Sequence, residues 1–365
     1  MKKLNFIIKC GLALLLLSFY SCESWLNVTP SDRLSEEMLF NDREGFVKAL
    51  NGVYIELNTN ELYGRNLTAG ALDVMGQYYS VASSSHAFYN YGGLVYTGND
   101  EKALFDNMWQ KCYAVIACCN TIIEKCDERQ DVLPGVYYGL YKGEALALRA
   151  MLHLDMLRLF GPVYDETSKT AECIPYVTNT DAQISPLLSA EVVLESVIGD
   201  LKTALNLLKE SDPVLTDGVR NEGNSIGDNA LNYRQFRLNY YAVKALLVRA
   251  YAWGHDESNA LVTAEEILRE VQVEGAEIFP FVTHAAATDV SKPDRVFSSE
   301  VMFSLYDSYR GTEIQDKLFL PTLDQIYTFT GKRLELGKDY SFYNSKGKLL
   351  WGKITYKGQR YYSTK

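Results

Sequence analysis

The segment from Gly143 to Phe160 constrains the fold most, because its apolar residues cover nearly the whole circumference of a helix. Such a helix cannot lie on a surface, since other elements must surround it. A second helix is expected to begin after Ser189, a favourable N-cap residue. Its apolar residues are three and four positions apart, as on one face of a helix: Leu194, Val197, Ile198, Leu201, Leu205 and Leu208. These patterns predict a mainly α-helical protein.

Further helices are predicted over residues 35–53, 101–128, 233–253 and 258–273. In the last pair, Tyr251 is followed by Ala260 and Ala264 at the spacing of a tetratricopeptide helical hairpin, in which small residues let two helices approach closely. The predicted fold is therefore mainly α, with tetratricopeptide-like helix pairs and long loops.

The pattern changes from Tyr340 onward. Residues 349–356 and 359–362 alternate between apolar and polar around Lys357-Gly358, which predicts a small β-hairpin near the C-terminus.

The first 21 residues have the layout of an export signal. Lys2 and Lys3 precede an apolar stretch, and the small residue Ser21 precedes Cys22. The apolar stretch between Lys9 and Cys22 is shorter than the roughly 20 residues that span a bilayer core. A cysteine after a small residue resembles a bacterial lipoprotein signal, so we predict that Cys22 becomes the lipidated first residue of the mature chain.

Charge and composition limit the ligands of the exported body. The chain has 36 basic and 46 acidic residues, a net charge of −10, which argues against nucleic acid and against broad binding to anionic lipid. Tyrosine is abundant, with 26 residues against 4 histidines. Tyrosine combines a flat apolar face with a polar tip, which suits ligands that are partly apolar.

The cysteines of the body do not indicate a redox or metal site. Cys112, Cys119 and Cys126 recur every seven residues, so they lie on one helical face about 10 Å apart. That separation is too large for disulfides among them, and no C-x-x-C pair supports zinc. We expect small buried hydrophobic residues.

Several segments, in order along most of the chain, resemble the SusD/RagB family of Bacteroidetes surface lipoproteins, which bind nutrients for an outer-membrane transporter. Single matches are short, but their order is specific. The segments are Cys22 to Pro30, Leu34-Ser35-Glu36-Glu37, Ala49 to Tyr54, Leu148-Arg149-Ala150, Arg158-Leu159-Phe160-Gly161, Ile174-Pro175-Tyr176, Arg249-Ala250-Tyr251 and Glu300-Val301-Met302-Phe303.

The resemblance implies a signal peptide over residues 1–21, an N-terminal helical region over 22–215, and a helical pair with an incomplete C-terminal region over 216–365. It also implies an outer-membrane, surface-facing lipoprotein that binds an oligosaccharide or similar nutrient. Its expected partner is a TonB-dependent, SusC-like transporter. Family members are usually considerably longer, so the chain is expected to be a fragment, a short member or a truncated reading frame, with an incomplete binding face.

Possible catalytic patterns have simpler explanations. Gly223 to Gly227 matches G-x-S-x-G, but it lies in a polar loop without the preceding strand that the motif needs. Arg149, His153, Asp155 and Arg158 share one buried helix, either as an acid–base site or as a polar strip whose members satisfy one another. The resemblance favours the strip. No metalloprotease, phosphate-loop or dinucleotide motif is present, so we predict no catalytic residue and no cofactor.

The segment from Gly76 to Asp100 is the candidate ligand-binding surface. It is a long, nearly uncharged insertion between helices, rich in serine, glycine and aromatic residues, and long loops on rigid scaffolds often carry binding. Alternatively, about half of these rings only fasten the segment to the helices. The predicted ligand-binding residues are Tyr78, Tyr79, His86, Phe88, Tyr89, Tyr91 and Tyr96.

Two other classes of function stay open on the sequence. A surface glycan hydrolase needs only a pair of carboxylates. A helical scaffold would bind protein partners and no small ligand.

Substitution of Cys22 tests the predicted lipid anchor. The Cys22→Ala variant should leave the membrane fraction and appear in the soluble fraction, because the acyl attachment site is gone. Fractionation followed by immunoblotting measures this. Unchanged membrane association would instead indicate an uncleaved anchor.

Overall fold

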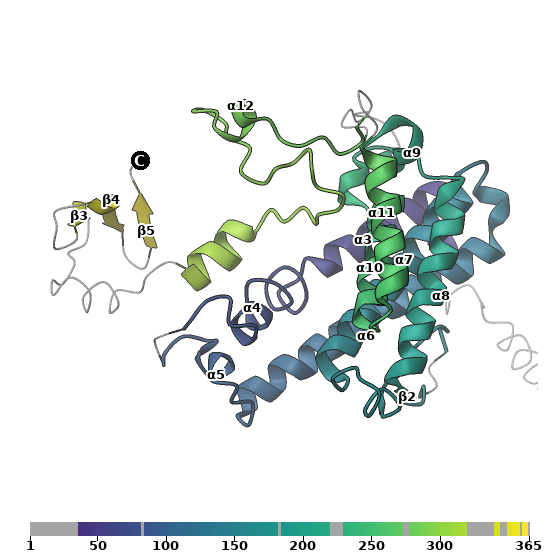
Figure 1. Cartoon of the computed structure of the whole chain (residues 1–365), viewed down its shortest axis with the longest axis horizontal. Helices are drawn as coiled ribbons and strands as arrows, with labels where there is room; N and C mark the ends of the chain where they lie inside the picture. The colour runs from purple at the N-terminus through teal and green to yellow at the C-terminus, as the bar shows by residue number, and fades with distance from the viewer. Residues whose placement is uncertain are drawn as a thin grey trace, which may run out of the picture.

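We describe a computed structural model of the 365-residue chain over residues 36–81, 84–181, 184–219, 229–272, 277–319, 339–343, 349–357 and 360–363. The signal segment, Cys22 and the G-x-S-x-G motif at 223–227 lie outside these ranges. The molecule is mainly α-helical (Figure 1). The helices are α2 (Glu36–Leu39), α3 (Arg43–Leu57), α4 (Ala71–Met75), α5 (Tyr89–Gly92), α6 (Asn99–Glu128), α7 (Tyr137–Phe160), α8 (Ala190–Lys209), α9 (Val214–Asp217), α10 (Tyr240–Trp253), α11 (Glu257–Val271) and α12 (His284–Ala287).

Shorter helical turns and five strands complete the described chain. The turns are η2 (Gln130–Val132), η3 (Asn229–Leu231), η4 (Arg234–Phe236) and the helical segment η5 (Gly311–Phe319). The strands are β1 (Glu172–Ile174), β2 (Leu188–Ser189), β3 (Asp339–Tyr343), β4 (Leu349–Lys357) and β5 (Arg360–Ser363).

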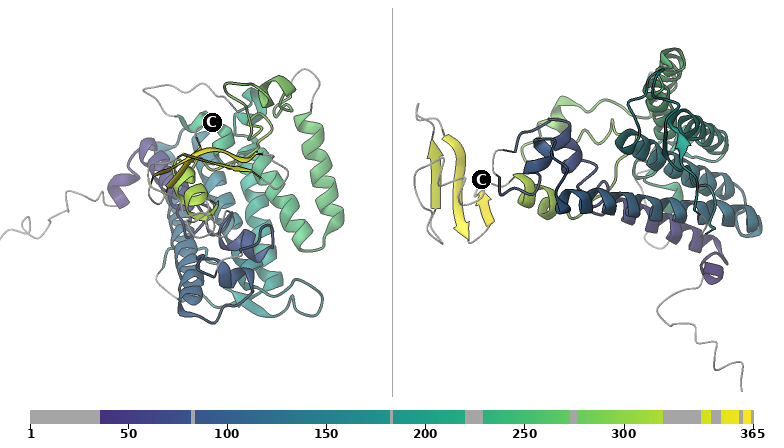
Figure 2. Two further views of the ribbon diagram at one scale, coloured as in Figure 1. Left: turned by 90° about the vertical axis from the view of Figure 1, so that its left-hand side faces the viewer. Right: turned by 90° about the horizontal axis from the view of Figure 1, so that it is seen from below.

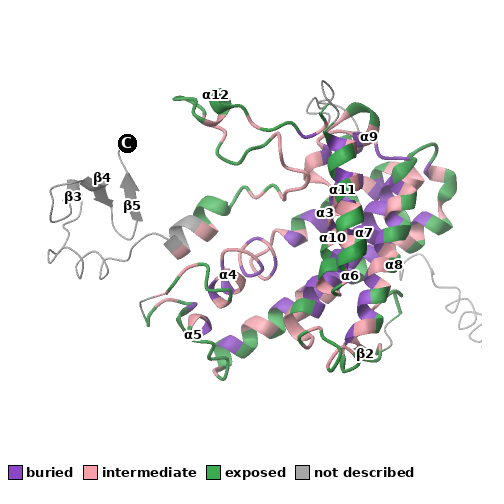
Figure 3. Cartoon of the chain, in the orientation of Figure 1, coloured by how far each residue is buried: buried purple, intermediate pink, exposed green. Residues whose placement is uncertain are grey.

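Helix α7 forms the centre of the core, as the sequence predicts. Every residue from Gly143 to Leu157 is buried, and α7 packs against α3, α6, α8 and α10 (Figure 3). The closest approach is to α8, because a Cβ placed on Gly143 would lie 2.8 Å from Cγ of Leu208. A larger residue at this position would therefore push the two helices apart.

The predicted helix after Ser189 is confirmed as α8. The Ser189 hydroxyl accepts a hydrogen bond from the backbone N–H of Val192 (3.4 Å), which caps the helix. The predicted apolar stripe faces the core, with Leu194, Val197, Leu201 and Leu208 buried. Ile198 and Leu205 are partly buried against the same core.

One predicted helix is interrupted and another begins later than predicted, in both cases because a polar side chain caps a new helix. The helix expected over 35–53 is interrupted between α2 and α3, where the Asp42 carboxylate accepts the N–H of Gly45 (2.9 Å). The helix expected from 233 begins only at Tyr240, after Asn239 accepts the N–H of Ala242 (3.0 Å). Tyr233 has a left-handed backbone (φ 52°), which a continuous helix would not allow.

The helical pair and the C-terminal β element are present. Helices α10 and α11 pack against each other, with Tyr251 buried and Ala260 partly buried against the core. Near the C-terminus β4 and β5 form the expected antiparallel hairpin, and β3 pairs with the other edge of β4 in a three-stranded sheet.

The N-terminal part of α6 extends beyond the bundle, and α4 and α5 lie alongside it (Figure 2). Ala71, Val74, Phe88 and Tyr91 form a small separate core there, against which Leu104 and Phe105 of α6 pack.

None of the described helices is both long and apolar enough to cross a bilayer.

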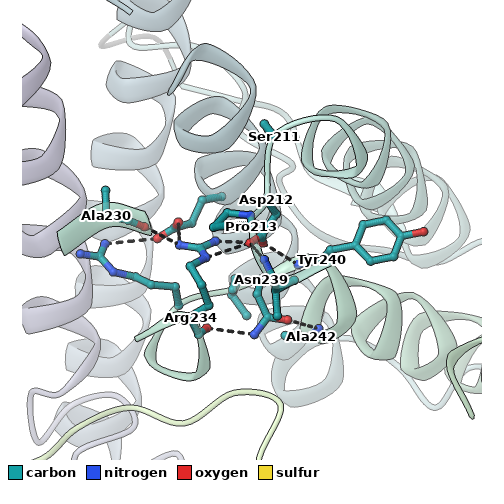
Figure 4. A network of polar contacts seen from close by, with 12 residues as sticks. Ser211, Asp212, Pro213, Ala230, Arg234, Asn239, Tyr240 and Ala242 are labelled. Carbon is teal, nitrogen blue, oxygen red and sulfur yellow. Dashed lines mark hydrogen bonds and ion pairs between the residues drawn. The ribbon is translucent and has the colours of Figure 1, made fainter. Parts of the chain in front are cut away.

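A buried guanidinium joins α7, the end of α8 and the start of α10 (Figure 4). Arg234 is completely buried and forms two parallel hydrogen bonds to the Asp212 carboxylate, at 2.9 and 3.0 Å. Its Nη1 also reaches Glu144 of α7 at 3.3 Å. Burial alone would lower the pKa of Arg234, but the charges of Asp212 and Glu144 outweigh it and raise that pKa. The Arg234 side chain therefore stays positively charged.

The same network fixes the backbone around it. Asp212 accepts the N–H of Tyr240 (2.9 Å), and Glu144 also pairs with Arg237 (3.2 Å). The Asn239 amide donates to the carbonyl oxygens of Arg234 (2.9 Å) and Met302 (2.7 Å). The segment that follows Met302 is thus tied to the beginning of α10.

Removing the central cation should destabilise the whole body. Arg234→Met should lower the free energy of unfolding by about 3–5 kcal/mol, because Asp212 would stay buried without a cation and Glu144 would keep only Arg237. Urea denaturation measures this. As a control, Lys48→Met removes an exposed ion pair with Glu44 (2.9 Å) and should leave the urea midpoint nearly unchanged, because solvent screens that pair. Equal losses in the two variants would contradict the role given to the network.

Candidate functional site

The aromatic segment predicted to bind ligand has buried and exposed rings. Phe88 and Tyr91 are each only 2% exposed, and their ring centroids are 5.6 Å apart in the small core beside α4. Their faces are therefore occupied by protein, so these two residues fasten the segment to the scaffold. This agrees with the alternative that some of the rings only hold the segment in place.

The other predicted residues are more accessible. Tyr78 is 83% exposed, and Tyr89 and Tyr96 are also exposed. Tyr79 is partly buried, and its hydroxyl donates to the carbonyl oxygen of Ala69; burial raises the pKa of Tyr79 to about 12.

His86 is partly buried too, and its Nδ1 accepts the N–H of Phe88 (3.1 Å). None of the seven residues lines the cavities described below.

Ring contacts connect this segment to the main core. Tyr91 and Tyr96 both pack on Phe105 of α6, at centroid distances of 5.9 and 5.5 Å. Phe105 in turn meets Phe160 of α7 (6.4 Å), which packs edge-on against Trp109 (5.1 Å). Among the exposed tyrosines, Tyr96 is thus packed on a row of aromatic residues that continues into the main core.

A groove that the sequence did not predict lies between the end of α3 and the segment before η5. Two adjoining cavities, of about 470 and 320 Å³, share Ile55, Asn58 and Tyr306. Tyr306 and Tyr309 line the larger one and are 73% and 72% exposed. We call this region the Tyr306 groove.

Polar side chains surround the exposed rings of the Tyr306 groove. The Asn58 amide donates to the carbonyl oxygen of Tyr306 (3.1 Å), which fixes that segment against α3. The Asn60 amide donates to Glu313 (2.9 Å). On the inner side, Phe236 contacts Tyr306 edge-on, with centroids 6.0 Å apart. Amide and carboxylate groups beside accessible aromatic faces suit a ligand that has both apolar faces and hydroxyl groups.

The Tyr306 groove and the predicted aromatic segment are structurally linked. Tyr309 lies two residues before the start of η5, and Leu318 of η5 packs against the small core that contains Phe88 and Tyr91. Figures 1 and 2 both show η5 next to α4. The two groups of exposed tyrosines therefore belong to the same end of the molecule.

The polar residues of α7 form a structural strip, as favoured from the sequence. Arg149 binds Asp200 of α8 through two hydrogen bonds, at 2.7 and 2.8 Å, and also Asn120 of α6 at 2.9 Å. His153 is fully buried; its Nε2 accepts the N–H of Val177 (3.0 Å), so its Nδ1 donates to the carbonyl oxygen of Arg149 (2.9 Å).

Burial lowers the pKa of His153 to about 3, so the ring is neutral at physiological pH. Both ring nitrogens have backbone partners, which leaves neither for proton transfer.

Side chains that could bind a metal do not cluster in the described part of the chain. The described residues contain no group of three or more histidine, cysteine, aspartate or glutamate side chains placed to hold a metal. Cys112, Cys119 and Cys126 are buried free thiols on one face of α6, as expected.

Comparison with known proteins identifies the family of this chain. Residues 24–216, more than half of the chain, match the SusD-like family model described as starch-binding and associating with the outer membrane. The chain belongs to the SusD-like family. The matched residues include helices α2 to α8 and therefore the buried α7.

The chain matches only part of the length of each individual relative. Two SusD-like proteins of Formosa agariphila are 27% and 25% identical to the chain over 202 and 211 residues, which is 50% and 57% of this chain. The chain spans only about a third of their length, 34% and 38%.

A crystal structure of a SusD homolog from Bacteroides thetaiotaomicron superposes with a TM-score of 0.51 and 22% identity, covering 67% of this chain and 43% of that one. This similarity supports the fold alone.

The neutral state of His153 predicts a pH dependence of stability. In the unfolded chain the ring has a pKa near 6.5, so below that pH the unfolded state binds a proton that the folded state excludes. The free energy of unfolding should therefore fall as the pH falls from about 6.5 toward 3, by at most about 1.4 kcal/mol per pH unit from this residue.

Urea denaturation between pH 4.5 and 7.5 measures this slope. A His153→Gln variant should be less stable but should have a flatter slope below pH 6.5. An unchanged slope would mean that His153 is charged in the folded state.

Proposed function

We propose that this chain is a non-catalytic glycan-binding lipoprotein, whose ligand contacts the Tyr306 groove and the exposed tyrosines of the neighbouring aromatic segment. The observation that carries the proposal is the pair of exposed rings, Tyr306 and Tyr309, in a cavity with amide and carboxylate side chains on a SusD-like scaffold. The description of the family as starch-binding supports a carbohydrate ligand.

The charge of the Tyr306 groove favours a neutral oligosaccharide. Its larger cavity is lined by Glu61, Asp307 and Glu313 and by no basic side chain. The smaller cavity adds Arg237, whose charge is paired with the buried Glu144. The carboxylates of the larger cavity would accept hydrogen bonds from sugar hydroxyls and would repel an acidic sugar. The aromatic faces would stack on the apolar faces of the sugar rings. The rings and the carboxylates of the cavity would therefore bind different parts of the same ligand.

The exposed residues of the aromatic segment extend this surface. Tyr78, Tyr89 and Tyr96 offer ring faces, and Tyr79 and His86 stand partly accessible beside them. Phe88 and Tyr91 contribute by fixing the segment, since their own faces are covered. Within the proposed function, the seven predicted residues thus divide into contact residues and supporting residues.

Membrane attachment and partner complete the proposal. A lipid on Cys22 would tether the body to the outer membrane on the surface side, and a SusC-like TonB-dependent transporter would receive the ligand. Tethering a binding protein beside a transporter raises the local ligand concentration, as in any linked system. Co-purification of a large β-barrel protein from native membranes tests the partner, and its absence would contradict this part.

The first variant tests the Tyr306 groove. A glycan array on the purified protein identifies a ligand, and calorimetry then measures its affinity. Tyr306→Ala combined with Tyr309→Ala should weaken binding roughly tenfold or more, because each lost stacking contact is worth about 1 kcal/mol. Phe281→Ala removes an equally exposed ring outside the groove and should have no effect. Full affinity in the double variant would exclude the groove.

A second pair of substitutions tests the aromatic segment independently. Tyr78→Ala combined with Tyr89→Ala should also weaken binding by roughly tenfold, with unchanged thermal stability because both rings are exposed. If affinity is lost only in the groove variant, the segment takes no part in binding. Turnover of the glycan, abolished by a single carboxylate substitution, would instead establish a hydrolase.

A further inference from the structure

A third cavity, of about 380 Å³, opens between α4, α7 and α10 and has the opposite charge to the Tyr306 groove. Its polar lining consists of Tyr63, Asp155, Arg158 and Arg249. Trp253 and three leucine side chains, Leu67, Leu72 and Leu159, form the apolar part of the wall. The volume falls within the range of small-ligand sites.

Asp155 lies at the centre of the polar lining. It is largely buried and receives three hydrogen bonds: from the Tyr63 hydroxyl (2.7 Å), from Nη1 of Arg158 (3.0 Å) and from Nη2 of Arg249 (3.1 Å). Both guanidinium groups meet the same carboxylate oxygen, Oδ1. One cation would neutralise Asp155, so the second leaves a net positive charge at the cavity.

The two arginines have donors to spare. A guanidinium carries five N–H donors, and within the described chain each of these groups has a hydrogen bond to Asp155 only. Their side chains are 33% and 46% exposed, so the remaining donors can reach a ligand. The Trp253 indole N–H, itself buried, also has no acceptor among the described residues. Donors therefore outnumber acceptors around this cavity.

We propose that this cavity binds a sugar carboxylate, that is, a uronic acid residue. The free N–H groups of Arg158 and Arg249 match the two oxygens of a carboxylate, for which guanidinium geometry is well suited. The three leucine side chains, and the part of the Trp253 indole that Arg158 (5.5 Å from its centroid) does not cover, provide an apolar surface for the sugar ring. A simple inorganic anion would use the cationic groups but would leave that wall uncovered.

The third cavity shares no lining residue with the Tyr306 groove. Leu72 of α4 lines the cavity, whereas Ala71 and Val74 of the same helix pack against Phe88 and Tyr91. The cavity and the aromatic segment therefore lie on different sides of α4. The three acids in the Tyr306 groove would repel a uronate, while the cavity would attract it. The uronate site thus stands whether or not the groove binds a neutral glycan.

Ligand-observed NMR titration of the full mature chain with D-galacturonate tests the proposal, with D-galactose and acetate as separate probes. Galacturonate should bind at least tenfold more tightly than either, because only it combines the carboxylate with the ring. Arg158→Gln and Arg249→Gln should each weaken galacturonate binding about tenfold or more. Arg269→Gln makes the same charge change on exposed α11, away from the cavity, and should leave binding unchanged.

An Arg249→Lys variant guards against misfolding, because it keeps a cation beside Asp155 but removes the planar fork. It should unfold at the same urea concentration as the unsubstituted chain and still bind galacturonate several-fold more weakly. Absence of galacturonate binding would overturn the proposal. Equal affinity for acetate, or full affinity in both glutamine variants, would overturn it as well. If the variant with both Tyr306→Ala and Tyr309→Ala loses galacturonate binding, the third cavity is not a binding site separate from the Tyr306 groove.

Discussion

The fold depends on one buried ion network, in which Arg234 connects helices that are far apart in the sequence. Its guanidinium binds Asp212, just after α8, and Glu144, inside α7. Asp212 and Asn239 then hold the first residues of α10 and the backbone of Met302. Because the network fixes the chain around residue 302, it also determines where Tyr306 and Tyr309 lie against α3. The position of the Tyr306 groove therefore depends both on this network, through the Asn239 amide, and on the hydrogen bond from Asn58 to Tyr306.

The helical body was largely predictable because its signals are local. The all-round apolar character of α7, the stripe of α8 and the cap at Ser189 each need only neighbouring residues. The interruption before α3 was missed, since Asp42 can cap a helix or lie on its surface with the same sequence around it. Arg234 was missed for a related reason: a charged residue in a polar stretch is usually exposed, and only its buried partners reverse that expectation.

The candidate sites were less predictable because they form between distant segments. Asn58 and Tyr306 are 248 positions apart, and no pattern in either segment refers to the other. In the aromatic segment, composition indicated a binding surface but could not distinguish Tyr78, which is exposed, from Phe88 and Tyr91, which are buried. Similarly, the strip on α7 was expected to satisfy itself. Arg158 does bind Asp155, but Arg149 binds Asp200 of α8 and Asn120 of α6. Asp155 and Arg158 also reach the third cavity, where Arg249 from α10 adds the second cation.

The packing of α6 also has a chemical consequence if the chain is exported as its N-terminal segment predicts. Cys112, Cys119 and Cys126 are free thiols, and burial raises the pKa of Cys126 to about 12 and moves the other two upward as well. Since the thiolate is the form that reacts with oxidants, the folded core keeps these three sulfur atoms inert. If α6 separated from α7, the thiols would return to ordinary acidity in an oxidising environment. Oxidised cysteines on α6 would then show that α6 and α7 had separated in that molecule.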